Sequence, residues 1–283
     1  MTCYIFGAIR MHLESYVNLP WLIVEETQAF KKDAMTKLLS HCTTSFSHSE
    51  KEGNLMTQVL SIHQKNPDKR RIREVIDMIA KGGIALLPSE TGYCFVGSSS
   101  YDSTCEKFLK LRPGHSKNKP FSLFCKDISQ VSHIAYVNTQ IFRIVTRAWP
   151  GPYTFVLPAM KNSPKTAASG KIKTIGVRIS SHLVIQSIME QLEHPLLVTS
   201  VTDEDELVAQ DYFNQDIEQD FWWTNVDGIC QHTPKNSFEV AIDTNENVPI
   251  KVSTMVDFSV NPPLLLRDGG WDLEFLGVFE KKF

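Results

Sequence analysis

This sequence lacks most of the short motifs that identify a chemistry on their own. Its six cysteines include no C-x-x-C pair and no Cys/His cluster with zinc-finger spacing, which excludes the usual structural zinc sites and dithiol motifs. P-loop, G-x-G-x-x-G, H-E-x-x-H and G-x-S-x-G patterns are also absent. Any phosphate binding must therefore come from Lys/Arg side chains, hydroxyl groups and backbone amides of turns.

Signals for export or membrane insertion are absent as well. No apolar run approaches the ~18 residues that a membrane span requires. Residues 1–10 contain a short apolar stretch with its charge after it rather than before it, unlike a secretory signal. We therefore expect reduced thiols, a cytoplasmic protein and no membrane partner.

The charge is unevenly distributed along the 283 residues. The net charge is −1 over residues 1–55, +12 over residues 56–180 and −14 over residues 181–283. A basic block of this size is typical of proteins that bind phosphates or nucleic acid. It is also compatible with two halves that neutralise each other across one fold, and charge alone favours this second interpretation. With 42% hydrophobic residues, the composition excludes collagen, coiled coil and wholesale disorder.

Periodic patterns begin close to residue 56. Residues 1–55 have weak periodicity and no motif, so we predict an N-terminal extension over 1–55 and one domain over 56–283. Helical spacing and start signals, including an apparent capping box from Ser103 to Glu106, predict helices over 67–81, 103–111, 138–149, 183–192 and 203–220. Apolar runs predict strands over 84–87, 93–96, 121–125, 153–157, 174–179, 196–199, 226–230, 240–243, 252–258 and 264–267. The alternation predicts an α/β fold of three layers around a mixed sheet.

Polar clusters follow or precede many of these strands, where α/β sheets usually bind ligands. They are Pro88-Ser-Glu-Thr-Gly-Tyr93, Lys110-Leu-Arg112 with the loop to Lys119, Trp149-Pro-Gly-Pro-Tyr-Thr154, Gly176-Val-Arg178, Thr199-Ser200, Ser253-Thr254 with Asp257, and Leu266-Arg-Asp-Gly269. Each cluster alone is better explained as a solvated face, a rigid turn or a structural ion pair. His115, the histidine of the cationic loop, is expected to be a bystander rather than a ligand.

The order of these clusters resembles the YrdC-like family, the L-threonylcarbamoyladenylate synthases. Their pattern runs P-T-[DE]-T-x-Y-G, K-x-R, K-P, P-G-P-x-T, G-x-R-x-P, T-S-A-N, S-T-x-x-D and L-R-x-G. This chain has Pro88-Ser-Glu-Thr91-Gly-Tyr93, Lys110-Leu-Arg112, Lys119-Pro120, Pro150-Gly-Pro-Tyr-Thr154, Gly176-Val-Arg178, Thr199-Ser-Val-Thr202, Ser253-Thr-Met-Val-Asp257 and Leu266-Arg-Asp-Gly269. The resemblance implies the three-layer YrdC/DHBP-synthase-like fold with a mixed twisted sheet.

Within the family, the chain looks most like the YciO branch. It shares the opening Met56-Thr-Gln…Ile-His63…Asn66-Pro67, the strand entry Pro150-Gly-Pro-Tyr-Thr-Phe155 and the strand Lys173-Thr-Ile-Gly-Val-Arg178. Met56 lies where those proteins begin. Residues 1–55 are therefore expected to be either a genuine extension or an upstream start assigned in error, and the second is favoured.

The family reaction implies the site residues. It condenses threonine, bicarbonate and ATP to threonylcarbamoyl-AMP, the precursor of t6A in tRNA, so this chain would be a nucleotidyltransferase. By resemblance, Lys110, Arg112, Ser200 and Thr202 form the catalytic group, and Thr91, Lys119, Thr154, Arg178, Ser253 and Thr254 bind substrate and nucleotide. Mg²⁺ is expected to accompany ATP on phosphate oxygens, with no protein side chain as its ligand.

Two departures from the family pattern keep a second function open. Thr202 replaces the asparagine of the S-x-N motif, and a hydroxyl cannot reproduce a planar carboxamide that donates and accepts at once. Four carboxylates from Asp203 to Glu206 follow it, and they would repel phosphates. The alternative is a YciO-type protein without synthase activity that binds nucleotide, tRNA or double-stranded RNA through its basic concave surface.

Overall fold

The computed structural model describes residues 57–112, 120–167, 173–201, 222–246, 248, 251–276 and 280–281. The predicted extension over 1–55, the loop 113–119 with His115 and Lys119, Thr202, and the predicted helix over 203–220 lie outside the described residues. The boundary between the two predicted domains therefore stays a prediction. No helix within the described ranges is long and apolar enough to cross a membrane.

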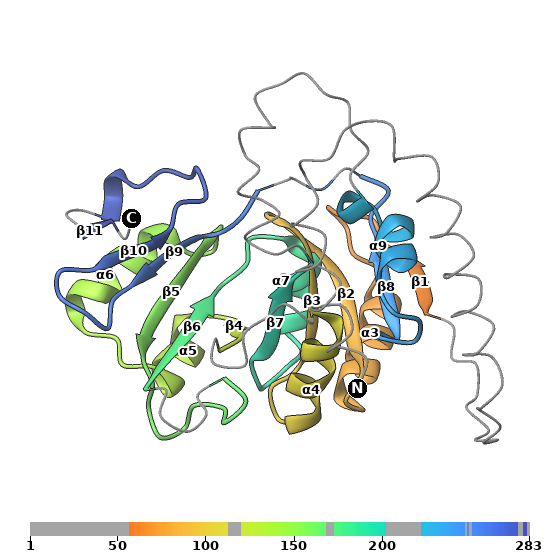
Figure 1. Cartoon of the computed structure of the whole chain (residues 1–283), viewed down its shortest axis with the longest axis horizontal. Helices are drawn as coiled ribbons and strands as arrows, with labels where there is room; N and C mark the ends of the chain where they lie inside the picture. The colour runs from red at the N-terminus through yellow and green to blue at the C-terminus, as the bar shows by residue number, and fades with distance from the viewer. Residues whose placement is uncertain are drawn as a thin grey trace, which may run out of the picture. The chain divides into compact units, whose positions relative to one another are not determined.

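A mixed sheet organises the described residues, as predicted (Figure 1). Its strand order is β1-β8-β2-β3-β7-β4-β6-β5-β9-β10-β11. The strands are β1 (Gln58–Ser61), β2 (Ile84–Ser89), β3 (Gly92–Ser98), β4 (Ser122–Phe124), β5 (Tyr153–Pro158), β6 (Thr174–Arg178), β7 (Leu196–Ser200), β8 (Val240–Asp243), β9 (Thr254–Asp257), β10 (Leu264–Arg267) and β11 (Glu280–Lys281). The β8–β2, β4–β6 and β5–β9 pairs are parallel, whereas the β2–β3, β3–β7 and β6–β5 pairs are antiparallel.

Helices pack on both faces of this sheet. They are α3 (Lys69–Ala80), α4 (Asp102–Leu111), α5 (Ile128–Ile134), α6 (Thr139–Ala148), α7 (Leu183–Met189) and α9 (Val226–His232), with short 3₁₀ turns at η4 (Trp222–Thr224) and η5 (Glu274–Leu276). The longest of these helices, α3, is capped by Asp68, which accepts hydrogen bonds from the backbone N–H groups of Arg70 and Arg71. It ends before Gly82, which has a φ of 82°, a left-handed conformation that glycine adopts with little steric cost.

Two hydrophobic cores lie on opposite faces of the sheet. The first takes side chains from α4, α5, α6 and α9 and from strands along the sheet between β8 and β10. The second takes side chains from α3 and α7 but only from strands β1, β8, β2, β3, β7 and β4. We call these six strands the covered half of the sheet. Strands β6, β5, β9 and β10 form the open half, because no described helix contributes a second core on their other face.

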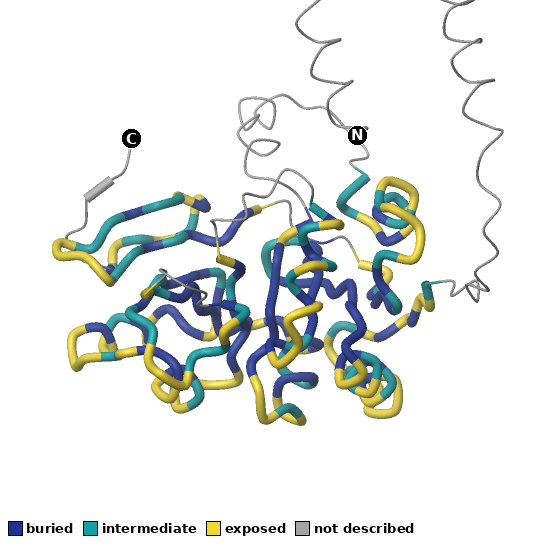
Figure 2. The backbone as a smooth tube through the Cα atoms, turned by 60° about the horizontal axis from the view of Figure 1, so that its bottom comes forward, coloured by how far each residue is buried: buried dark blue, intermediate teal, exposed yellow. Residues whose placement is uncertain are grey.

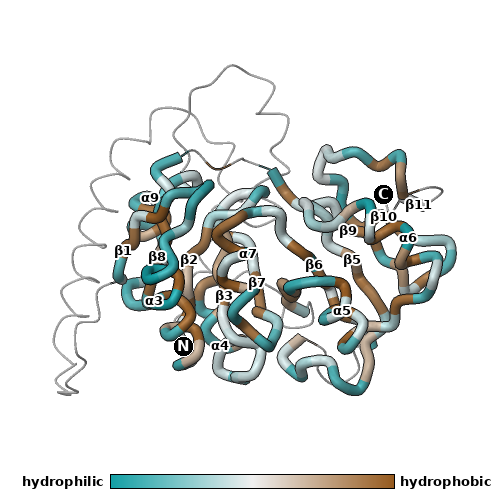
Figure 3. The backbone as a smooth tube through the Cα atoms, turned by 180° about the vertical axis from the view of Figure 1, so that it is seen from behind, coloured by the Kyte–Doolittle hydropathy of each residue, from teal (hydrophilic) through white to brown (hydrophobic). Residues whose placement is uncertain are grey.

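Burial along β2, β7, β5 and β9 follows this division, whereas β6 of the open half has four of its five residues buried. All six residues of β2 and four of five in β7 are buried, because helices lie on both of their faces (Figure 2). In β5 and β9, buried residues such as Phe155 and Val256 alternate with the partly exposed Val156 and Met255. The hydrophobic segments of the chain accordingly gather in the central strands (Figure 3).

Two local predictions were wrong. The segment predicted as a strand over 226–230 is the helix α9, in which Val226 and Ile229 are buried at helical spacing and Asn225 caps the N-terminus. The predicted capping box at Ser103 does not form, because α4 begins one residue earlier at Asp102, with Tyr101 as its cap residue and no side-chain cap hydrogen bond. Strand β1 and helix α5 were not predicted.

Candidate functional site

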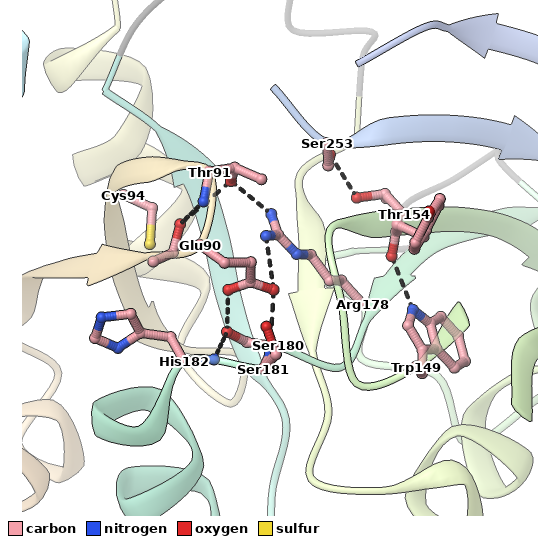
Figure 4. Close-up of polar contacts among 12 residues, drawn as sticks. Glu90, Thr91, Cys94, Trp149, Thr154, Arg178, Ser180, Ser181, His182 and Ser253 are labelled. Carbon is pink, nitrogen blue, oxygen red and sulfur yellow. Dashed lines mark hydrogen bonds and ion pairs between the residues drawn. The ribbon is translucent and has the colours of Figure 1, made fainter. Parts of the chain in front are cut away.

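An arginine at the end of β6 reaches the turn between β2 and β3. Arg178 is only 7% exposed, and its Nη1 donates a hydrogen bond to Thr91 Oγ1 at 2.9 Å. Its Nη2 forms an ion pair with Glu90 Oε1, also at 2.9 Å (Figure 4). The ring of Phe124 lies below the guanidinium, 5.6 Å from Cζ to the ring centroid. The predicted site residues Thr91 and Arg178 are thus in direct contact.

Glu90 is held on several sides. Besides the ion pair with Arg178, Oε2 accepts a hydrogen bond from Ser180 Oγ at 2.5 Å and Oε1 accepts one from the Ser181 N–H at 3.1 Å. Burial alone raises the pKa of Glu90, but the Arg178 charge and the Ser180 hydrogen bond outweigh burial and hold the pKa below its usual value. Glu90 is therefore an anion at neutral pH, and its charge offsets that of Arg178.

A buried histidine and a buried thiol border this pair. Burial lowers the pKa of His182, with the Glu90 charge acting in the opposite direction, so the imidazole is neutral at pH 7. Its Nδ1 is buried and has no hydrogen-bond partner among the described residues. Burial raises the pKa of Cys94 to about 12, which keeps the thiol protonated and unreactive. Neither group is suited to act as a nucleophile here.

A second polar group joins the starts of β5 and β9 to the end of β10. Thr154 is 3% exposed, and its Oγ1 lies 2.9 Å from Ser253 Oγ. Arg267 donates from Nη2 to Ser253 Oγ at 2.7 Å and from Nε to Ser253 O at 2.8 Å. Thr254 points to the opposite side and accepts a hydrogen bond from the Gly269 N–H at 3.0 Å. A Cβ at Gly269 would collide with Val252 O, so the motif requires glycine there.

Strand register joins the two polar groups on the open half of the sheet. Phe155 pairs with Val177 in the antiparallel β5–β6 ladder, so Thr154 follows next to Arg178 on the same face. Ser200 lies opposite Cys94 in the β3–β7 ladder and is exposed. Alternation of side chains puts the residues of the first core on the other face of the sheet.

The K-x-R pair approaches the end of β7. Arg112, just after α4, donates from Nη1 to Thr199 Oγ1 at 2.8 Å, whereas Lys110 is exposed on the last turn of that helix. Thr199 precedes Ser200 in β7, so the K-x-R pair lies at the same end of the strand as Ser200. The two side chains point to opposite faces of the sheet, and Thr199 is on the side of the first core. Of the ten predicted site residues, Lys119 and Thr202 lie outside the described part of the chain.

Three contact residues were missed by sequence reasoning. Glu90 and Arg267 contact predicted site residues directly, and Ser180 contacts Glu90. In the sequence only motif membership marks the three residues, with Ser180 at the position of the proline in G-x-R-x-P. A concavity of about 1070 Å³ in the described residues contains none of the predicted site residues. Charged side chains of both signs line it, and they are exposed. Its size alone therefore does not indicate a site.

The prediction that no protein side chain holds the magnesium ion stays a prediction. Among the described residues, no group of three or more His, Cys, Asp and Glu side chains could hold a metal ion. Glu90, the carboxylate next to Arg178, already accepts three polar contacts. A magnesium ion would therefore rely on the oxygens of a bound phosphate chain, and the assignment of Mg²⁺ stays a prediction.

Comparison with known proteins identifies the relatives of this chain. A protein from Escherichia coli named YciO is 28% identical over 225 residues, covering 77% of this chain and 98% of that protein. A threonylcarbamoyl-AMP synthase from Pyrococcus abyssi is 24% identical over 220 residues, covering 77% of this chain and 59% of the synthase.

Solved structures agree on the fold. The E. coli YciO crystal structure matches with a TM-score of 0.66 at 25% identity, covering 78% of this chain and 99% of that one. P. abyssi Sua5 in complex with L-threonine matches with a TM-score of 0.66 at 21% identity, covering 80% of this chain and 63% of Sua5. The family model for Sua5, YciO and YrdC, described as "Telomere recombination", matches residues 77–269. The chain belongs to the Sua5/YciO/YrdC family.

Proposed function

We propose that this protein is a threonylcarbamoyl-AMP synthase. In this reaction the threonine amine combines with bicarbonate-derived CO₂ to an N-carbamate, which attacks the α-phosphorus of ATP and releases pyrophosphate. The carbamate and ATP, which react in the second step, both carry negative charge. The work of the site is therefore to bring anions together and to offset their charge rather than to activate a nucleophilic side chain.

The observation that supports this proposal is the contact between Arg178 and Thr91 beside the Thr154–Ser253–Arg267 group. A guanidinium next to a hydroxyl suits a carboxylate and a hydroxyl on one small substrate. We assign threonine to Arg178 and Thr91, and the nucleotide to Thr154 and Ser253. Thr254, which the resemblance also implied for nucleotide binding, is fully buried, points to the opposite side and accepts a hydrogen bond from the Gly269 N–H, so it is left out of this assignment. The names of two relatives, a threonylcarbamoyl-AMP synthase and a Sua5 protein complexed with L-threonine, support the same assignment.

The K-x-R pair takes the phosphates in this scheme. Arg112 has a hydrogen bond from Nη1 to Thr199, and Lys110 remains exposed on the last turn of α4. Two cations two residues apart can follow a triphosphate chain and the developing charge on the carbamate. Ser200 and Thr202, together with Lys119, complete the proposed set. Mg²⁺, bound to phosphate oxygens, would supply further charge neutralisation.

The test is a pyrophosphate assay on the full chain with ATP, threonine, bicarbonate and Mg²⁺. Release must depend on threonine and on bicarbonate, since an unrelated ATPase would need neither. Threonylcarbamoyl-AMP is then identified by mass spectrometry. Absence of threonine-dependent release, with intact folding, would reject the synthase assignment.

A second candidate is an RNA-binding protein without synthase activity. Thr202 at the position of the S-x-N asparagine favours it, as does a cluster of exposed cations before and along the first turns of α3, namely Lys65, Lys69, Arg70, Arg71 and Arg73. Binding of double-stranded RNA that weakens steeply with salt, in a protein without pyrophosphate release, would support this candidate instead.

A further inference from the structure

The ion pair between Glu90 and Arg178 has a consequence for which ligands the site accepts. Arg178 is nine-tenths buried, and its Nε is a buried donor without a hydrogen-bond partner among the described residues. Such an orphaned donor indicates that Arg178 is built to meet a ligand. Yet the guanidinium already lies against a carboxylate, with Arg178 Nη2 and Glu90 Oε1 only 2.9 Å apart.

We propose that Glu90 is a specificity-determining residue, which restricts the Arg178 subsite to zwitterionic ligands such as an α-amino acid and excludes phosphate. The Glu90–Arg178 pair has no net charge. A free dianion near Arg178 meets the repulsion of Glu90 at almost the same distance as the attraction of the guanidinium. An α-amino acid instead presents a carboxylate for Arg178 and an ammonium group that the Glu90 charge attracts.

The geometry keeps Glu90 in place for this role. Ser180 Oγ and the Ser181 N–H hold the two carboxylate oxygens from the side of α7, so the carboxylate cannot turn away when a ligand arrives. The pairing is charge-assisted and largely desolvated, with the two side chains 8% and 14% exposed, so its electrostatic effect is only weakly screened by solvent.

The proposed function explains why phosphate must be excluded from the Arg178 subsite. The identity of the amino acid, threonine, rests on that proposed function. A site that holds threonine next to the phosphates of ATP must prevent phosphate from occupying the threonine position. A bare arginine would bind either ligand, and phosphate more strongly. A paired arginine discriminates through the second charge.

The test is Glu90→Gln in the full chain, which keeps the shape and most hydrogen bonds of the side chain but removes its charge. Calorimetric titration with inorganic phosphate alone should show at least about tenfold tighter binding than in the wild type. Threonine binding should weaken severalfold, and phosphate should compete with threonine in the variant but not in the wild type.

Two further variants separate charge from structural damage. Glu90→Asp keeps the charge and should retain phosphate exclusion, even if threonine binds less well. Glu239→Gln removes the carboxylate from another partly buried pair, 3.1 Å from Lys107 Nζ, and should leave phosphate affinity unchanged. An unchanged phosphate affinity in Glu90→Gln, or equal gains in all three variants, would overturn the proposal.

The phosphate titration tests the role of Glu90 independently of the proposed function. If the wild type fails to bind threonine but Glu90→Gln still gains phosphate affinity, the filter is confirmed and the assigned amino acid is wrong. If threonine binds and Glu90→Gln gains no phosphate affinity, the substrate assignment survives and the filter is rejected.

Discussion

The covered and the open half of the sheet use the same kind of strand for different purposes. In the covered half, β2 is buried along its whole length, because α3 and α7 pack on the face of the sheet opposite the first core. The same face of β6, β5, β9 and β10 has no described helix packed in a second core on it. In the open half, β5 and β9 bury one face and leave the other partly exposed. Arg178, Thr154 and Ser253 contribute polar side chains to the uncovered face, whereas Ser200 and the Arg112–Thr199 contact lie at the end of β7 in the covered half.

The polar residues follow the same division. The contacts from Arg178 to Glu90 and from Thr154 to Ser253 lie where the second layer of helices ends, on the open half or at its border with the β2–β3 turn. The first core continues beneath them and fixes the backbones that carry them. For Arg178, Thr154 and Ser253, the face of the sheet that packs the core is therefore opposite the face that carries the polar contacts, whereas Arg112 and Thr199 lie on the side of the first core.

The largest expected effect tests the structural side of this comparison. Leu87→Ala removes a fully buried side chain of the second core, on the face that α3 and α7 cover, and should lower the free energy of unfolding by about 2–5 kcal/mol. Val156→Ala, at a partly exposed position of the open half, should cost less than about 1 kcal/mol. Urea denaturation measures both. Equal losses would mean that the open face is packed as tightly as the covered one.

The next effect concerns catalysis. Arg112→Ala removes the hydrogen bond to Thr199 and a cation of the proposed phosphate site, so threonine-dependent pyrophosphate release should fall by at least about 100-fold. Lys110→Ala should behave similarly, with little change in unfolding free energy because Lys110 is exposed. Lys126→Ala, an exposed cation of the separate concavity, is the control. Full activity of both site variants would place the phosphates elsewhere.

Sequence patterns predicted the long buried strands of the covered half better than the short helices of the fold. Continuous apolar runs such as Ile84-Ala-Leu-Leu87 indicate buried strands without ambiguity, and most predicted strands are present. Short amphipathic segments fail this test, since Val226 to Cys230 fits a strand or a single helical turn equally well until Val226 and Ile229 are seen to share a buried side. Helix α5, only seven residues long, has too few apolar residues to be recognised.

The site shows a similar limit. The order of the motifs pointed to Thr91, Thr154, Arg178 and Ser253, and the fold brings them together in pairs. The motif order could not indicate which polar groups pair. Thr91 and Arg178 are 87 residues apart, and they meet only because the strands and helices between them fold into one sheet. Glu90 was visible as a motif letter, but its role as the partner of Arg178 depends on this tertiary contact.

A smaller effect comes from the pH dependence of stability. The pKa of Glu90 is held below its usual value in the folded protein, so its charge contributes stability that is complete above the unfolded-state pKa near 4.5 and is lost as the pH falls toward the folded-state pKa. One proton gives a slope of at most about 1.4 kcal/mol per pH unit. Denaturation across this acid range should be less pH-dependent in Glu90→Gln, whereas parallel curves would show that the ion pair contributes nothing net.

The smallest effect compares the same substitution in the two halves. Thr154→Val removes the hydroxyl that contacts Ser253 Oγ in the open half, and Thr104→Val removes one that donates to Ser98 O at 2.8 Å beside the covered half. Each should cost about 0.5–1.5 kcal/mol of unfolding free energy, because each deletes one buried hydrogen bond. Only Thr154→Val should also weaken ATP binding, by severalfold in a titration, since Ser253 then loses one of the groups that orient it. Equal ATP affinities in the two variants would show that the open face is not where the nucleotide binds.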